Sequence, residues 1–312
     1  MRWRGRQGSD NILDHRNRSS SSAGGFRGAR GAGLLPIVFQ LLLRSKGGRK
    51  LLLVLAVVGV ILYLLGINPL ALLSGQPTGY QSSQLAPNQT NEQTADLADL
   101  NDPQAQFISV VLADTETIWQ TLFTAQGLNY REPTLVLFRN AVQSACGYAS
   151  AAVGPFYCAA DERIYIDLSF YDELSRRFDA PGDFAQAYVV AHEVGHHIQN
   201  LTGVLPRFHQ AKASLSERDS NAMSIRVELQ ADCYAGVWGY YTNQAGYLET
   251  GDLNEALNAA RQIGDDAIQR RVQGYVVPES FNHGTSEQRR YWFQQGFESG
   301  NWQACDTFNT TM

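Results

Sequence analysis

The sequence is poor in the residues that most often bind metals or form cross-links. It has six histidines and four cysteines in 312 residues, and no two cysteines form a C-x-x-C pair. An even count without that spacing fits two disulfides in an oxidising compartment better than a cysteine metal site. Of the three possible connectivities we favour Cys146–Cys158, which closes a local loop, and Cys233–Cys305, which ties the C-terminus back. Four unrelated thiols are the alternative.

Acidic residues are scarce in the first 50 positions. Residues 1–50 carry 11 Lys or Arg and two Asp or Glu, a net charge of +9, so the remaining 262 residues carry −14. Such a tail is typical of nucleic-acid binding or of membrane orientation. No aromatic interleaving or recognition fold accompanies its arginines, so no nucleic-acid partner is expected. We predict that residues 1–50 form a basic, disordered N-terminus.

Residues 51–67, LLLVLAVVGVILYLLGI, contain no charge, and NPLALL extends this run to residue 73. That length suits one helix across a membrane. The basic RSKGGRK before it places the N-terminus in the cytoplasm by the positive-inside rule. We therefore predict a single transmembrane helix at residues 51–73, with the rest of the chain outside the cytoplasm. A signal peptide or a buried core helix is the alternative. The apolar residues 31–43 are shorter, are broken by Pro36, and are not expected to form a second span.

Residues 74–104 are rich in Gln, Asn, Ser, Thr and Pro and are expected to form a flexible linker. The body, residues 105–312, follows a helix start at Asp102-Pro103 and is almost entirely helical beyond Asp183. A small sheet followed by a helical half is an α+β arrangement. Short strands are expected at residues 134–138 and 164–168, with a third candidate at 154–158.

Three of the six histidines lie in AHEVGHHIQN, residues 191–200. The flanking pattern predicts a helix at residues 184–202. An Asp183–Gln186 capping pair is expected at its start, and Gly203 is expected to end it.

His192 and His196 are four residues apart, so both imidazoles project from one helix face and could hold one ion. Glu193, turned about 100° around the axis, can approach a water held by that ion without being a ligand. Gly195 has no side chain and would let another element come close. A helix with core histidines remains possible on these residues alone. A third ligand is therefore required, since catalytic zinc usually has three protein ligands and a water.

RVELQADCYAG, residues 226–236, supplies that third ligand within a helix expected at residues 221–242. Glu228 can offer the metal an oxygen, while Asp232, one turn later, accepts a hydrogen bond from a ligand imidazole and fixes its tautomer. Surface ion pairing is the alternative, but the surrounding sequence is too apolar for two exposed carboxylates. The two pairs together predict a zinc site.

The H-E-x-x-H and E-x-x-x-D motifs resemble those of the gluzincin metallopeptidases. The chain is more similar still to the bacterial neutral zinc metallopeptidases, which share its RWRGR…SDN opening, its single span, and its SACG…GPFYC and HEVGHHIQN segments. This similarity covers nearly the whole chain. It implies a zincin-like fold, a Zn²⁺ cofactor and hydrolysis of peptide or protein substrates. The shared span, together with the positive-inside orientation, predicts an inner-membrane protein with its catalytic domain in the periplasm.

The expected mechanism uses the zinc to activate a water, with Glu193 as general base. His283, which precedes a Thr285–Gln288 capping pair, is the candidate donor to the developing oxyanion; an ordinary loop histidine is the alternative. His197 is expected to pack or to support the site. Residues 149–156 are the expected lip for an extended substrate. The second interpretation of function is a catalytically silent, membrane-bound scaffold with a zincin fold. Neither the oligomeric state nor the substrate follows from the sequence.

Overall fold

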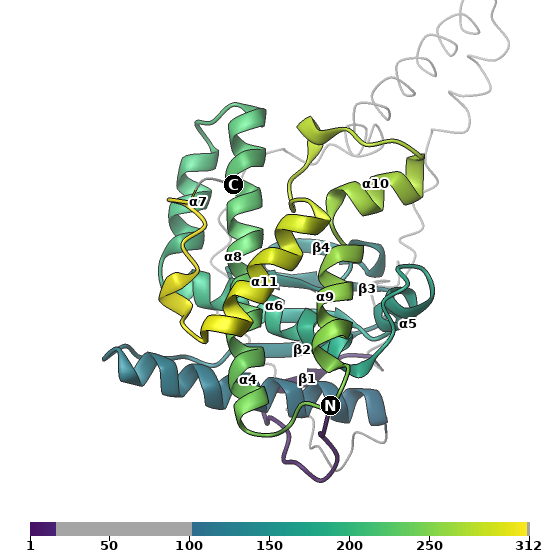
Figure 1. Cartoon of the computed structure of the whole chain (residues 1–312), viewed down its shortest axis with the longest axis vertical. Helices are drawn as coiled ribbons and strands as arrows, with labels where there is room; N and C mark the ends of the chain where they lie inside the picture. Colours follow the sequence, from purple (N-terminus) through teal and green to yellow (C-terminus); the bar gives the residue numbers. More distant parts are fainter. Residues whose placement is uncertain (17–101, 311–312) are drawn as a thin grey trace, which may run out of the picture. The chain divides into compact units, whose positions relative to one another are not determined.

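The computed structural model describes residues 1–16 and 102–310 (Figure 1). The predicted transmembrane helix and all but the end of the predicted linker lie outside these residues. Within them, a small sheet is followed along the chain by a mostly helical half, so the α+β prediction is confirmed.

The main sheet has four strands in the order β1-β2-β6-β5. β1, β2 and β6 are parallel, and β5 pairs antiparallel to β6 at the edge. Three strands match the predictions to within two residues, whereas β1 and the β3–β4 hairpin were not predicted. The bounds are β1 Ile12–Asp14, β2 Thr134–Phe138, β3 Ala141–Ser144, β4 Gly147–Ser150, β5 Phe156–Cys158 and β6 Arg163–Asp167.

Alternation along the central strands gives the sheet two apolar faces. Leu135 and Leu137 of β2 join the core formed with the helices, whereas Val136 and Phe138 join a smaller cluster that Val142 of β3 contacts. The sheet is thus covered on one face by helices and on the other by the β3–β4 hairpin.

α6, α8, α9 and α11 pack against one another, and Figure 1 shows them as neighbours. α8 and α11 approach so closely that a Cβ on Gly236 would lie 2.0 Å from the carbonyl oxygen of Phe293. The bounds are α4 Pro103–Ala125, α5 Ser169–Arg176, α6 Asp183–Leu201, α7 Val204–Lys212, α8 Glu217–Gln244, α9 Asp252–Gln262, α10 Asp265–Gln273 and α11 Ser286–Ser299. Among the described residues, no helix combines the length and the apolar character that crossing a membrane requires.

The N-terminal residues 1–16 belong to the same compact unit as residues 102–310. Ile12 and Leu13 of β1 are buried. Trp3 packs edge-on against Phe107 of α4, with 5.5 Å between the two ring centroids. The guanidinium of Arg6 bonds to the buried carboxylate of Asp114. The predicted disorder of residues 1–50 is therefore wrong for residues 1–16, because their apolar and basic side chains find partners far along the chain.

The limits of the body also change. α4 begins at Pro103 with Asp102 as its N-cap, whose carboxylate accepts the amide of Gln104 at 2.9 Å. The helix start predicted at Asp102-Pro103 is confirmed. Residues 102–104 thus belong to a helix of the body, and residues 1–16 pack in the same compact unit.

The position of β1 constrains any membrane topology. β1 hydrogen-bonds to β2, so residues 12–14 and 134–138 must lie on the same side of a membrane. The predicted single span, residues 51–73, falls between them in the sequence and would separate them. A single crossing with the N-terminus inside and the body outside is incompatible with this sheet.

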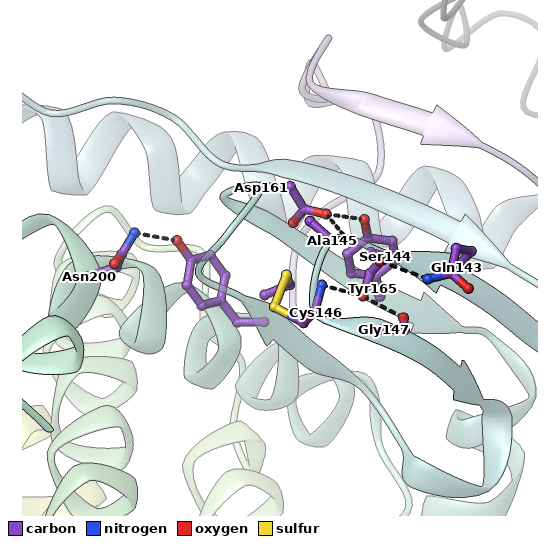
Figure 2. Close-up of a disulfide and its surroundings, with 10 residues drawn as sticks. Gln143, Ser144, Ala145, Cys146, Gly147, Asp161, Tyr165 and Asn200 are labelled. Carbon is purple, nitrogen blue, oxygen red and sulfur yellow. Dashed lines mark hydrogen bonds between the residues drawn. A yellow bond between two sulfur atoms is a disulfide. The ribbon is translucent and has the colours of Figure 1, made fainter. Parts of the chain in front are cut away.

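Both predicted disulfides are present. Cys146–Cys158 joins the β3–β4 turn to β5, and Cys233–Cys305 joins α8 to the C-terminal segment. Figure 2 shows the first bridge, beside which the Asp161 carboxylate accepts the amide of Ala145 at 3.0 Å and the hydroxyl of Tyr165 at 2.7 Å. The turn is therefore held by side-chain hydrogen bonds as well as by the bridge.

Candidate metal centre

α6 carries the histidine motif. The predicted helix matches it to within one residue, and Gly203, with φ 78°, follows its C-cap as expected. The predicted Asp183–Gln186 capping box is wrong, because Gly182 is the N-cap, and the first-turn amide of Phe184 donates instead to the carboxylate of Glu255 at 3.0 Å. The Asp183 carboxylate instead accepts from the Met1 ammonium at 2.9 Å, which fastens the N-terminal segment to the start of α6.

Gly195 brings α6 and α8 together. A Cβ at this position would lie 2.9 Å from the carbonyl oxygen of Ala231 and 3.0 Å from its Cα. Real Cβ atoms essentially never approach backbone so closely, so only glycine permits this crossing. Ala231 lies three residues after Glu228, and the crossing therefore carries Glu228 to the histidine face of α6.

His192, His196 and Glu228 converge at this crossing. The Nε2 atoms of His192 and His196 lie 3.2 and 3.5 Å from the two carboxylate oxygens of Glu228. One ligand atom from each residue lies within 4.8 Å of the others. Two imidazole nitrogens and one carboxylate oxygen form a donor set of catalytic zinc sites, which leave a further position open. The residues therefore fit a zinc ion.

Asp232 supports His192 as the spacing predicted. Its Oδ1 lies 2.8 Å from Nδ1 of His192, and it also accepts from the hydroxyl of Tyr188 at 2.5 Å. Arg289 of α11 donates to both carboxylate oxygens, from Nε at 2.8 Å and from Nη2 at 2.9 Å. Burial opposes the charge of Asp232, but Arg289 and His192 outweigh it and lower the carboxyl pKa. An ionised Asp232 accepts the Nδ1 proton and turns Nε2 of His192 toward Glu228.

The same charges act on the imidazole. Burial lowers the pKa of His192, but the carboxylates of Asp232 and Glu228 prevail and raise it to about 10. The pKa of Glu228 falls despite burial, because His196 and His192 favour its anion. The pocket thus favours a cation between the two helices.

Glu193 is buried and lines the same cavity. Burial raises the pKa of its carboxyl, an effect that the neighbouring His196 and His192 oppose. A raised pKa makes the carboxylate a stronger base than an exposed glutamate. It is thus suited to take up a proton.

His283 lies in the loop before α11 and lines the cavity with the α6 residues. The Thr285–Gln288 capping box predicted after it is confirmed. Its Nδ1 lies 3.0 Å from Oδ1 of Asp265, whose other oxygen accepts the backbone amide of His283 at 2.7 Å. The hydrogen bond to Asp265 raises the pKa of His283. His283 thus places a ring at the cavity lining that is either cationic or able to donate an N–H group.

The cavity has a volume of about 680 Å³. Its lining includes His192, Glu193, His196 and Glu228 and, as a rim, residues 151–156, which are most of the predicted substrate lip. β5 lies at the sheet edge beside this rim. The site and the lip therefore share one cavity.

The supporting residues missed from the sequence include Tyr188, Arg289 and Gln199, whose Oε1 lies 2.9 Å from Nδ1 of His196. Tyr188 lies one turn before His192 and Gln199 almost one turn after His196, so helical spacing could have indicated both. Arg289 is 57 residues from Asp232, and no local pattern connects them. His197, predicted to pack or to support the site, is fully buried. Its Nδ1 lies 3.0 Å from the hydroxyl of Tyr157, and its Nε2 lies 2.6 Å from the carbonyl oxygen of Arg131.

A family model described as "Putative neutral zinc metallopeptidase" matches residues 1–308. The chain belongs to this family. The resemblance inferred from the motifs is confirmed, and the family implies zinc as the cofactor.

Two relatives illustrate the range of the similarity. "Uncharacterized protein YpfJ" of Escherichia coli strain K12 is 46% identical over 314 residues, with 100% of both chains covered. "Uncharacterized protein Rv2575" of Mycobacterium tuberculosis strain H37Rv is 38% identical over 261 residues, covering 79% of this chain and 84% of that one. No solved structure matches.

Proposed function

We propose that this protein is a zinc-dependent endopeptidase with a zincin-like catalytic fold. The observation that carries the proposal is the convergence of His192, His196 and Glu228 in a cavity that Glu193 also lines. His192 and His196 would hold zinc through Nε2, and Glu228 through its carboxylate. Bound zinc supplies a Lewis acid that polarises the scissile carbonyl and lowers the pKa of water.

Glu193 would take the proton from the attacking water and pass it to the leaving amine. Its raised pKa supports both transfers, because the carboxylate is basic enough to accept a proton and its acid form still strong enough to release one. His283, oriented by Asp265, would donate to the carbonyl oxygen as negative charge develops there. The backbone of an extended substrate would pair with the edge near residues 149–156.

The test is cleavage of a quenched peptide or casein by the full chain, with and without a chelator. The full chain is required because residues 1–16 supply β1. Glu193→Gln keeps the shape of the side chain but removes the base, so turnover should fall by about 10²–10⁴-fold while bound zinc is retained. If the variant cleaves as fast as the parent, the catalytic proposal is wrong. That result would support the alternative interpretation, a catalytically silent scaffold.

We also propose that the described domain lies outside the cytoplasm, since both cysteine pairs are bridged. Its N-terminal segment must lie on the same side, so an anchor would cross the membrane an even number of times. The test labels single cysteines, placed at exposed Arg2 and exposed Val272, with an impermeant maleimide in intact cells. Both should react. Labelling at Val272 alone would contradict the placement of the N-terminal segment and the domain on the same side of the membrane. Labelling at neither position would place the domain in the cytoplasm.

A further inference from the structure

Two buried amide side chains, Gln199 and Gln230, lie on the Nδ1 side of His196. Nδ1 of His196 lies 2.9 Å from Oε1 of Gln199. The amide nitrogen of Gln199 donates to the carbonyl of Val227 at 2.7 Å and to Oε1 of Gln230 at 3.1 Å. The amide nitrogen of Gln230 donates to the carbonyl of Cys305 at 2.8 Å.

The direction of these hydrogen bonds is fixed by the two backbone carbonyls at their ends. A carbonyl only accepts, so Val227 and Cys305 must each face an N–H group. Gln230 therefore presents its oxygen to Gln199, and Gln199 in turn presents its oxygen to His196. An amide oxygen only accepts, so Nδ1 of His196 must carry the proton. Its Nε2, which lies 3.5 Å from Glu228, is left with the lone pair that a metal needs.

One end of this chain of hydrogen bonds depends on a cross-link. Cys305 is bridged to Cys233, which lies three residues after Gln230 on α8. Arg226 also holds the following segment by donating to the carbonyl of Phe308 at 2.9 Å. The Cys305 carbonyl is thus held against Gln230 by a covalent bond and by side-chain hydrogen bonds.

We propose that Gln199 and Gln230 are positioning residues for zinc binding, which set the His196 tautomer under the direction of the Val227 and Cys305 carbonyls. The Cys233–Cys305 disulfide holds the distal carbonyl in place. The two ligand imidazoles are therefore supported differently: His192 by an ionic cluster, and His196 by neutral amides. This proposal rests on the proposed zinc ligands.

The first experiment measures the tautomer directly. In zinc-free full-length protein with ¹⁵N-labelled histidine, at a pH where His196 is neutral, the ¹⁵N shifts should show the proton on Nδ1. Gln199→Met keeps a similar volume but removes the acceptor, so the proton should redistribute toward Nε2. A proton on Nε2 in the parent, or an unchanged tautomer in Gln199→Met, would overturn the proposal.

The second experiment measures zinc affinity by competition with a chelator. Gln199→Met should weaken it by about 10–100-fold, the usual effect of losing a ligand's hydrogen-bond partner, and Gln230→Met by less, since Val227 still orients Gln199. Replacing both Cys233 and Cys305 by alanine should weaken it, whereas the same change at Cys146 and Cys158 should not. Alanine is used instead of a reductant because free thiolates would bind zinc. If the parent binds no zinc, the proposed function fails. If the parent binds zinc and all variants match it, only the positioning role fails.

Discussion

The two sides of the cavity are built differently. The side formed by α6 and α8 is buried and interlocked: His192 and Glu193 are 6% and 7% exposed. The rim, which includes residues 151–156 and Val272 of α10, presents apolar side chains to solvent, with Val153 65% and Val272 67% exposed. Fixed, desolvated groups suit metal binding and proton transfer, whereas an open apolar rim suits substrates of varied sequence. If the protein acts as proposed, chemistry and substrate recognition would lie on separate elements.

The largest expected effect follows from removing the carboxylate between the helices. Glu228→Gln should weaken zinc binding by more than the roughly 100-fold loss typical of residues behind the ligands, because a ligand atom itself loses its charge. Metal analysis and chelator competition measure this loss. Glu217→Gln, at the exposed start of the same helix, is the matched control and should bind zinc like the parent.

The closeness of the two helices is tested at Gly195. Gly195→Ala places a Cβ against the backbone of Ala231, so the helices must separate, at a cost of about 1–3 kcal/mol in unfolding free energy, and zinc affinity should fall. Gly239→Ala is the matched control, since the atoms nearest its Cβ would belong to the side chains of Phe297 and Phe184 rather than to backbone. Equal zinc affinity in Gly195→Ala and parent would show that this helix crossing does not set the site.

Asp265 at the start of α10 pairs with His283, which lines the cavity, and this pairing should depend on pH. The folded-state pKa of Asp265 is below its usual value of 3.8. The ionised carboxylate therefore contributes to the unfolding free energy above pH 3.8, and this contribution is lost as the pH falls through the lowered pKa. The folded-state pKa of His283 is above its usual value of 6.5. The protonated ring therefore contributes to the unfolding free energy below pH 6.5, and this contribution is lost as the pH rises through the raised pKa. Asp265→Asn should therefore reduce the unfolding free energy most between about pH 4 and 6.5.

The expected loss is about 1–3 kcal/mol, measured by chemical denaturation across that range. Part of it should persist at higher pH, because Asp265 also accepts backbone amides of the His283 loop. A difference between parent and variant that does not change between pH 4 and 9 would contradict the ionic pairing.

The smallest effect is expected on the rim. Val153→Asp places a charge on an apolar wall of the cavity, so KM for peptides with apolar side chains should rise several-fold. Zinc content should stay the same, and stability should change by less than about 0.5 kcal/mol, since the side chain is mostly exposed. A loss of zinc in this variant would show that the two sides are not independent.

Local spacing explains why much of the site could be predicted. His192 and His196, and likewise Glu228 and Asp232, are separated by about one helical turn, and a turn is a local property of sequence. β2 was equally clear, as a short apolar run between turns. The zinc-site residues that could be predicted are those whose geometry one helix fixes.

The failures are contacts between distant segments. β1 is three residues long and lies in a segment whose composition resembles disorder, yet it pairs with β2 more than 100 residues later. Asp183 was predicted to cap its helix, but the ammonium of Met1 competes for its carboxylate. Arg289 reaches Asp232 only because α11 packs on α8. Such partners are decided by the tertiary fold.

The central claim is that His192, His196 and Glu228 hold one zinc ion. X-ray absorption at the zinc edge of the full-length protein tests it most directly, because it reports the atoms around the metal. The account predicts one zinc per chain with nitrogen and oxygen neighbours at about 2.0–2.2 Å and a first shell that changes in Glu228→Gln. Sulfur neighbours at about 2.3 Å, or a shell unchanged in that variant, would contradict it.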